Sequence, residues 1–220
     1  MRDMRIALCN GYEMKISENR KIRIADEAGR GAGCIVYDAI YWDQMQIKHK
    51  IRVRECYPAY IQLTRAATGE LVPSGNPEKF EKAKNRFTDA YKRNTDIRNT
   101  LGLTNSTVNA VDVISCNHTV YILLPMDEGI DYRYYEDQSL QELFRHMKSL
   151  AQIILKYHQK GYLHLDIKPE NVLILPETPE HVILFDFDSV TAIGELQKNA
   201  GIPYSDGFSA PEQMQGKIKK

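Results

Sequence analysis

The sequence predicts an α+β protein, in which an antiparallel β-sheet with one helix precedes a mainly helical part. Two patterns predict this. Apolar and polar residues alternate in Ile22-Arg23-Ile24-Ala25 and again from Ile47 to Cys56, which is the period of a strand with one solvated face. Apolar residues between Ser139 and Lys160 recur at helical spacing instead.

The composition indicates a globular protein and excludes several other classes. Of 220 residues, 43% are apolar and 26% are charged, and the net charge is zero, so no nucleic acid or anionic membrane is favoured as an obligatory partner. No apolar run approaches the ~20 residues that span a bilayer, and residues 1–9 do not resemble a signal peptide. The cysteines form no C-x-x-C pair, which predicts a reduced cytoplasmic protein without disulfides or a zinc site. They are Cys9, Cys34, Cys56 and Cys116.

The first half is expected to alternate strands with turns. Glycines at three alternate positions, Gly29, Gly31 and Gly33, predict a turn whose backbone can approach a phosphate. A hairpin is expected over residues 40–58, with its turn near Asp43. Turn-forming residues between 59 and 76 predict an inserted hairpin or loop.

Two helices and two strand pairs are expected after that. One helix begins at Pro77 and runs to about Thr95 or Arg98. Strands follow over residues 108–114 and 119–124, around a turn at Asn117-His118. The longest predicted helix, from 139 to 160, starts with a capping box and is expected to be a core helix. Its apolar positions are Leu140, Leu143, Phe144, Met147, Leu150, Ala151, Ile154, Tyr157 and His158. Short strands are expected over residues 172–175 and 182–185.

The last strand pair is flanked by two polar motifs. Before it stands the segment His164-Leu165-Asp166-Ile167-Lys168-Pro169-Glu170-Asn171, and after it Phe185-Asp186-Phe187-Asp188. Together they resemble the catalytic loop and metal-binding motif of the protein kinase family. A polar turn with these residues by coincidence is the alternative, and the number of matching positions at fixed spacing weighs against it.

The resemblance implies phosphoryl transfer from ATP with Mg²⁺. Asp166 would be the catalytic base, and Lys168 would neutralise charge on the transferred group. Asn171 would act in the catalytic loop and, with Asp186, would bind Mg²⁺ through oxygen. Lysine two residues after the aspartate is the pattern of Ser/Thr kinases, so the resemblance implies serine or threonine hydroxyls of a protein as acceptors.

The resemblance also implies a two-lobe fold that binds the nucleotide. The N-lobe would comprise residues 1–127, with a hinge at about 124–128, and the C-lobe residues 128–220. The glycine-rich pattern matches at Gly29, Gly31 and Val36, whereas Cys34 occupies the third glycine position and Gly33 stands one residue early. Arg54 takes the place of the phosphate-binding lysine. A solvated basic edge strand is the other reading of Arg54.

The hinge would bind the adenine edge. Leu124 would stand at the entrance to the pocket behind the adenine. Pro125 has no N–H group, so Met126 or Asp127 would have to provide the backbone donor.

Several departures from the family pattern support a rival hypothesis, a pseudokinase or nucleotide-binding scaffold. The helix position that should offer a glutamate to the strand lysine is Ala90, with Asp89 and Glu81 as fallbacks. Asp188 replaces the glycine of D-F-G, and Arg54, Cys34 and the missing C-terminal helices support the same hypothesis. Leu165 replaces an arginine that normally binds a phosphorylated activation loop, so the resemblance implies an enzyme that does not need this switch. A kinase for a small-molecule hydroxyl is a third hypothesis, which Ala210-Pro211-Glu212 disfavours because that motif points to protein substrates.

The segment 201–213 resembles the end of an activation segment, with Ser189, Thr191, Tyr204 and Ser205 as candidate phosphorylation sites. The resemblance stops soon after it, so the C-lobe is expected to be incomplete. We therefore expect exposed apolar surface around Ile154, Phe208 and the final segment, covered by a partner chain or by an oligomer.

Overall fold

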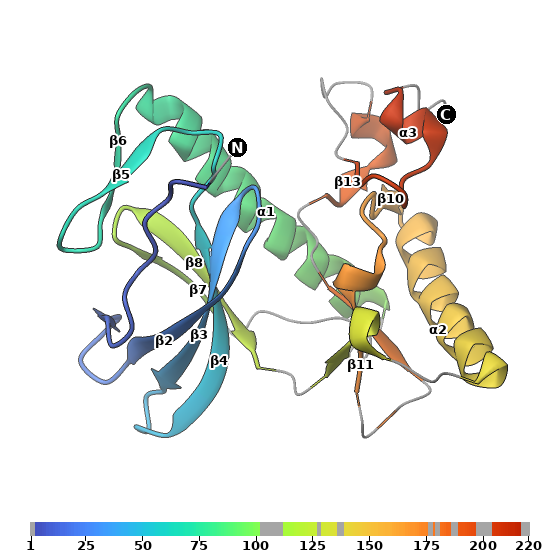
Figure 1. Cartoon of the computed structure of the whole chain (residues 1–220), viewed down its shortest axis with the longest axis horizontal. Coiled ribbons are helices and arrows are strands. Elements are labelled where there is room, and N and C mark those ends of the chain that lie inside the picture. The colour runs from blue at the N-terminus through green and yellow to red at the C-terminus, as the bar shows by residue number, and fades with distance from the viewer. Residues whose placement is uncertain are drawn as a thin grey trace. The chain divides into compact units, whose positions relative to one another are not determined.

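The computed structural model describes residues 3–101, 112–126, 129–135, 139–175, 178, 181–185, 189–196 and 204–216. The chain divides into two compact units (Figure 1). The first comprises Met1–Asp89 and Asn109–Met126, and the second comprises Ala90–Val108 and Asp127–Lys220. Helix α1 (Pro77–Leu101) contributes residues to both units.

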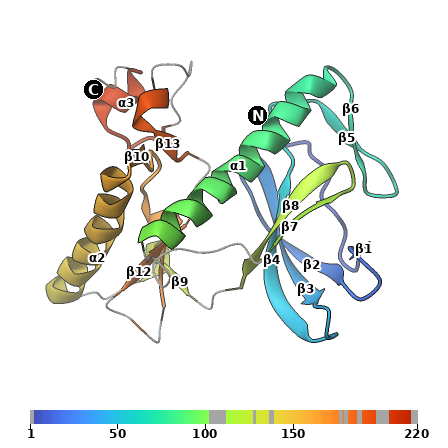
Figure 2. The ribbon, with the colours of Figure 1, turned by 180° about the vertical axis from the view of Figure 1, so that it is seen from behind.

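A six-stranded antiparallel sheet forms the body of the first unit, in the order β1-β2-β3-β4-β8-β7 (Figure 2). Strand β4 lies inside this sheet, between β3 and β8. The predicted hairpins at 40–58 and around 117–118 are both present, and Asn117 and His118 have φ of 51° and 59° in their turn. Residues 108–111 of the predicted strand lie outside the described residues. The strands are β1 (Glu13–Lys15), β2 (Lys21–Arg30), β3 (Cys34–Trp42), β4 (Lys48–Cys56), β7 (Asp112–Cys116) and β8 (Thr119–Pro125).

The expected inserted hairpin consists of β5 (Leu63–Arg65) and β6 (Leu71–Pro73). It brings Arg65 to Glu55 of β4, a carboxylate with no solvent exposure. Arg65 donates to Glu55 at 2.6 Å, and the hydroxyls of Tyr37 and Tyr121 each donate to it at 2.8 Å. A buried charge is tolerated only when it is paired and hydrogen-bonded. The network therefore fixes the hairpin to the sheet.

Helix α1 begins at Pro77, as predicted, and ends three residues beyond Arg98. In the first unit it buries Phe80, Ala83 and Phe87, which recur at helical spacing.

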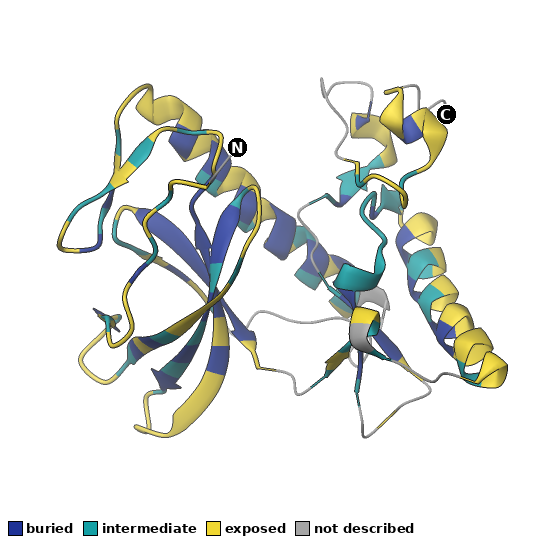
Figure 3. Cartoon of the chain, in the orientation of Figure 1, coloured by how far each residue is buried: buried dark blue, intermediate teal, exposed yellow. Residues whose placement is uncertain are grey.

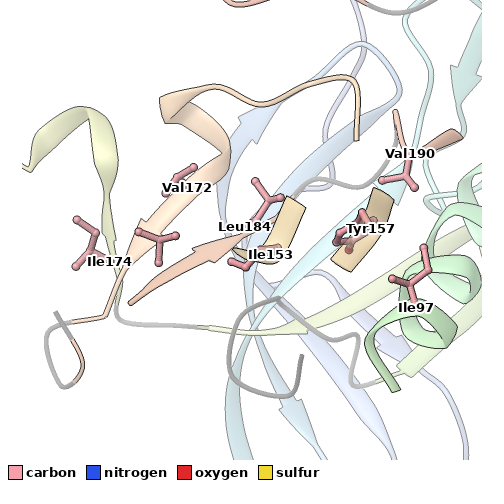
Figure 4. Packing of buried hydrophobic residues seen from close by; sticks show 8 residues of the cluster. Ile97, Ile153, Tyr157, Val172, Ile174, Leu184 and Val190 are labelled. Atoms are coloured by element: carbon pink, nitrogen blue, oxygen red, sulfur yellow. The ribbon is translucent and has the colours of Figure 1, made fainter. Parts of the chain in front are cut away.

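A small hydrophobic core holds the second unit together (Figure 4). It joins α1, α2 (Leu140–Gln159) and the paired strands β11 (Val172–Ile174) and β12 (Val182–Leu184). The members are Ile97, Ile153, Tyr157, Val172, Ile174, Val182, Leu184 and Val190. The remaining elements are β9 (Ile130–Asp131), η1 (Tyr132–Tyr134), β10 (Tyr162–Leu163), η2 (Pro169–Asn171), β13 (Thr191–Ala192), η3 (Ile193–Glu195) and α3 (Pro211–Met214).

The N-terminus of α2 is as predicted, but its expected buried face is only partly correct: Tyr157 is buried and Leu150 packs against the core cluster. Ser139 and Glu142 form the capping box, whereas the fully buried positions are His146, Ser149, Ile153 and Tyr157. Much of the predicted core face is exposed (Figure 3), with Leu140 at 69%, Leu143 at 38%, Phe144 at 66% and Met147 at 45%. Apolar spacing shows where apolar residues lie on a helix, and the neighbouring elements decide which face is covered.

The four cysteines are free thiols, of which Cys34 and Cys56 are buried register partners on β3 and β4. Among the described helices, none has the length and apolar character that a membrane crossing needs.

Candidate active site

The polar loop between β10 and β11 has an unusual backbone at Leu165. Its φ of 64° is left-handed, which costs an L-residue roughly 1–2 kcal/mol. The side chain of Gln213 donates to the Leu165 carbonyl at 2.6 Å. Further along, Pro169 opens η2, and the N–H of Asn171 donates to the carbonyl of Lys168 at 2.9 Å. These contacts fix the backbone on both sides of Asp166.

Three polar side chains surround the carboxylate of Asp166. Lys168 Nζ donates to Oδ2 at 2.9 Å, and Asn171 Nδ2 donates to the same oxygen at 3.1 Å. Asn171 Nδ2 also donates to the backbone carbonyl of Asp166 at 2.8 Å. On the other oxygen, the Ser205 hydroxyl donates to Oδ1 at 2.6 Å. The structure thus brings together three predicted residues and one that was not assigned to the site.

These contacts decide the charge of Asp166. Its burial alone would raise the pKa, but the hydrogen bonds from Lys168, Ser205 and Asn171, together with the charge of Lys168, outweigh burial and lower the pKa below the usual 3.8. Asp166 is therefore a carboxylate at neutral pH and can accept a hydrogen bond from a further hydroxyl.

Ser205 was predicted only as a candidate phosphorylation site. Its hydroxyl also accepts from Lys168 Nζ at 3.0 Å, so it joins both ends of the Asp166–Lys168 ion pair. Its backbone N–H donates to Ser209 Oγ at 2.9 Å, and its carbonyl accepts from the N–H of Ser209 at 3.0 Å. The reciprocal bonds make a compact turn before α3. A second serine directly before Ala210-Pro211-Glu212 is the local signal for that turn, but not for the contact with Asp166.

The donors for a metal ion are described only in part. Asn171 is 3% exposed; its amide nitrogen is used by Asp166, which leaves its amide oxygen as the atom suited to a hard cation. The other predicted ligand, Asp186, lies outside the described residues. Phe185 precedes it, and the N–H of Phe185 donates to the Asn171 carbonyl at 3.0 Å. Within the described residues, no three His, Cys, Asp or Glu side chains form a metal-binding group.

Residues 74–219 match the family model of the protein kinase domain. The chain belongs to the protein kinase family. The match covers well over half of the chain and includes the loop around Asp166.

Curated relatives of this kinase domain are protein kinases from distant organisms. Citron rho-interacting kinase from Rattus norvegicus is 33% identical over 105 residues, which is 44% of this chain and 5% of the relative. Serine/threonine-protein kinase D from Synechocystis sp. is 27% identical over 135 residues, which is 58% of this chain and 26% of the relative. The kinase domain thus spans about a quarter or less of the length of these relatives.

The solved structure of PpkA-294 in its apo form resembles the kinase domain with a TM-score of 0.68 and 23% identity, covering 94% of this chain and 71% of that one. At this identity the likeness supports the fold alone. It agrees with a two-lobe kinase fold with an antiparallel N-lobe sheet and an incomplete C-lobe.

The glycine-rich turn of the kinase domain joins β2 and β3. Gly29 pairs with Val36, and Val36 pairs with Arg54 on β4, so three predicted nucleotide-binding residues lie side by side on adjacent strands. An added Cβ at Gly29 or Gly33 would meet no atom within 4 Å among the described residues. Protein packing therefore does not require these glycines, whereas close approach of a ligand would.

Arg54 is not part of a solvated edge strand. It is 8% exposed on an interior strand; its guanidinium contacts Cys34 Sγ at 3.4 Å and lies 5.6 Å from the centre of the Phe87 ring. Lys50 on the same strand is exposed. The edge-strand hypothesis is therefore wrong, because Arg54 is a buried cation on an interior strand; that it takes the place of the phosphate-binding lysine stays a prediction.

The strand face beside the predicted hinge carries an ion pair. Leu124 pairs with Arg52 of β4, and Arg52 pairs with Asp38 of β3, to which it donates at 3.2 Å. Leu124 is 9% exposed and Met126 is 36% exposed, whereas Asp127 lies outside the described residues. An ion pair in this position is a departure from an apolar ligand pocket.

The helix position at which a glutamate is expected is occupied by Ala90, which is buried and has no carboxylate. The fallback acids are on the helix surface: Glu81 pairs with Lys84 at 2.7 Å, and Asp89 is exposed. Asp188 lies outside the described residues.

Proposed function

We propose that this chain is an ATP- and Mg²⁺-dependent protein kinase that phosphorylates serine or threonine hydroxyls. The arrangement of Lys168, Asn171 and Ser205 around the ionised Asp166 carries the proposal. A structural turn has no need for a partly buried, negatively charged carboxylate that is held by three side chains, whereas a base for an acceptor hydroxyl does.

In the proposed reaction, the acceptor oxygen bonds to the γ-phosphorus while the bond from phosphorus to the ADP oxygen breaks. Asp166 orients the acceptor hydroxyl and takes its proton. Lys168 is held beside that carboxylate and supplies positive charge for the transferred group. Asn171 and Asp186 would hold Mg²⁺, which would supply positive charge to neutralise the phosphates.

The residues that would bind the nucleotide are assigned from the sequence resemblance to protein kinases. The proposed phosphate-binding group is Gly29, Gly31, Gly33, Val36 and Arg54, and the proposed adenine-binding group is Leu124, Met126 and Asp127. We also propose that residues 1–127 are the N-lobe and residues 128–220 the C-lobe.

Thermal shift and phosphate transfer test the proposal together. ATP with Mg²⁺ should raise the melting temperature, and transfer of labelled phosphate to a serine-containing protein should be lost in Asp166→Asn. The exposed Asp89→Asn is the matched control and should transfer as the wild type does. Transfer that persists in Asp166→Asn would contradict the assigned role.

A pseudokinase that binds nucleotide as a scaffold is the second candidate. Three departures favour the scaffold: Arg54, Ala90 and the Arg52–Asp38 pair. Each stands where an active kinase would have a different group to contact or position the nucleotide. A melting temperature that rises with ATP, without phosphate transfer at any pH, would favour the scaffold over the enzyme.

We further propose that a partner chain or an oligomer covers the exposed apolar face of α2. Phe208 is 53% exposed and Ile154 is half-buried, which adds apolar surface in the second unit. Contiguous exposed apolar surface on a folded protein marks an interaction site.

A further inference from the structure

We propose that Arg5 is a positioning residue for the glycine-rich turn, Gly31–Cys34, and sets it for binding phosphate. This inference rests on the proposed nucleotide-binding function of that turn. Arg5 lies far from the turn in sequence, in the segment before β1, and no motif of the family includes it here.

The guanidinium of Arg5 binds three backbone carbonyls. Its NH2 donates to Gly31 O at 2.8 Å and its NH1 to Cys34 O at 3.2 Å; NH1 also donates to Tyr57 O. The side chain is 7% exposed. A planar fork of N–H donors suits this arrangement, whereas a lysine ammonium at the end of a flexible stem does not.

The segment that carries Arg5 is itself held on both sides. Arg30 NH1 donates to the Arg5 carbonyl and Arg65 Nε to the Ile6 carbonyl, each at 2.7 Å. The Leu8 N–H donates to the Tyr37 hydroxyl at 3.1 Å. Arg5 is therefore fixed to the sheet before it reaches the turn, and little side-chain freedom remains to be lost there.

The contacts bind the carbonyls of the turn, and its first N–H, that of Gly31, donates to the Cys34 carbonyl at 3.0 Å. Besides the bonds to Arg5, the Gly33 carbonyl accepts from Tyr57 N at 3.1 Å and the Ala32 carbonyl from Ala59 N at 2.9 Å. Among the described residues, the N–H groups of Ala32 and Gly33 have no protein acceptor. Successive free N–H groups in a turn form an anion-binding concavity.

Packing holds the turn only at its buried end, Cys34, because Gly31 and Ala32 are exposed. An open depression of about 600 Å³ lies beside it, and Arg5, Gly31, Ala32 and Leu63 line part of its wall. The backbone faces open space there. The turn is therefore restrained by hydrogen bonds, which come from the Arg5 guanidinium and from the N–H groups of Tyr57 and Ala59.

Hydrogen exchange without nucleotide tests the restraint separately from the function. In Arg5→Ala, the amides of Gly31, Tyr57 and Ala59, which donate to carbonyls of the turn, should exchange at least tenfold faster, while those of β7 and β8 stay unchanged. Arg5→Lys should show the same local change, and it covers the case in which Arg5→Ala does not fold. The exposed Arg86→Ala on α1 is the control and should match the wild type.

Nucleotide binding then tests the consequence. Arg5→Ala and Arg5→Lys should weaken ATP binding about tenfold and raise KM for ATP, with kcat unchanged. Unchanged exchange at the turn, equally faster exchange throughout the sheet, or wild-type ATP affinity in both variants would each overturn the role of Arg5. If wild-type protein binds no ATP, the proposed function fails, and the exchange result still decides whether Arg5 holds the turn.

Discussion

The Ser205 hydroxyl donates a 2.6 Å hydrogen bond to Oδ1 of Asp166 and accepts one from Lys168, although 39 residues separate it from the aspartate. This contact joins the segment before α3 to the polar loop around Asp166. It gives the loop a third polar side chain that orients the carboxylate.

Replacing Ser205 by alanine should reduce phosphate transfer by about tenfold to a hundredfold. A hydrogen bond to a charged group contributes about 1.5–3 kcal/mol, and each 1.36 kcal/mol is about a factor of ten in rate. Ser205→Thr keeps the hydroxyl and should retain most activity. Steady-state kinetics would measure both, with the exposed Ser17→Ala as control. Equal activity of Ser205→Ala and Ser17→Ala would contradict the role of the hydroxyl.

Replacing Lys168 by alanine should move acid unfolding to higher pH. In the wild type the pKa of Asp166 is below the usual 3.8, so the stabilisation by its ionised form is present above 3.8 and is lost as the pH falls below it. Without Lys168, the carboxylate of Asp166 loses one hydrogen bond and a neighbouring positive charge. Burial, which disfavours the ionised form, then has more effect, and the pKa of Asp166 rises. Circular dichroism during an acid titration would show the shift, and the exposed Lys148→Ala should not show it. A midpoint equal to that of the wild type would mean that Lys168 does not stabilise the carboxylate.

Short-range patterns predicted the catalytic loop and the helix cap because their contacts lie within a few residues. Two of the three side chains that donate to the Asp166 carboxylate, Lys168 and Asn171, come from the same loop. Ser205 and Arg5 were missed as contact residues because nothing in local spacing indicates which distant segment returns to a loop. In the alternating pattern of its strand, Glu55 falls on the same face as the apolar Ile51 and Val53. A carboxylate at such a position is the sequence feature that indicates a buried ion pair.

Removing Arg65 should destabilise the first unit much more than removing an exposed arginine. Arg65→Met leaves the fully buried Glu55 without its cation, which typically costs about 3–5 kcal/mol. Burial and the charge of Glu55 raise the pKa of Tyr37 and Tyr121, so both stay neutral donors and cannot replace the cation.

Urea unfolding would measure the difference. Arg52→Met, which removes the more exposed pair with Asp38, should cost about 0–1 kcal/mol. Adding Glu55→Gln to Arg65→Met should recover part of the loss, because the uncompensated charge is gone. Equal losses for the two arginines would show that Glu55 is not held as an ion in the folded protein.

The exposed face of α2 should promote association without contributing to stability. Leu140 and Phe144 are 69% and 66% exposed, whereas Ile153 on the same helix is 2% exposed. Leu140→Glu with Phe144→Glu should change the free energy of unfolding by less than about 0.5 kcal/mol, and Ile153→Ala should lower it by about 2–5 kcal/mol. The double variant should bind less apolar dye and associate less in sedimentation velocity, because the charges replace the surface that a partner would cover. Wild-type protein that binds no dye and sediments as a single monomer at high concentration would contradict a covering partner for this helix.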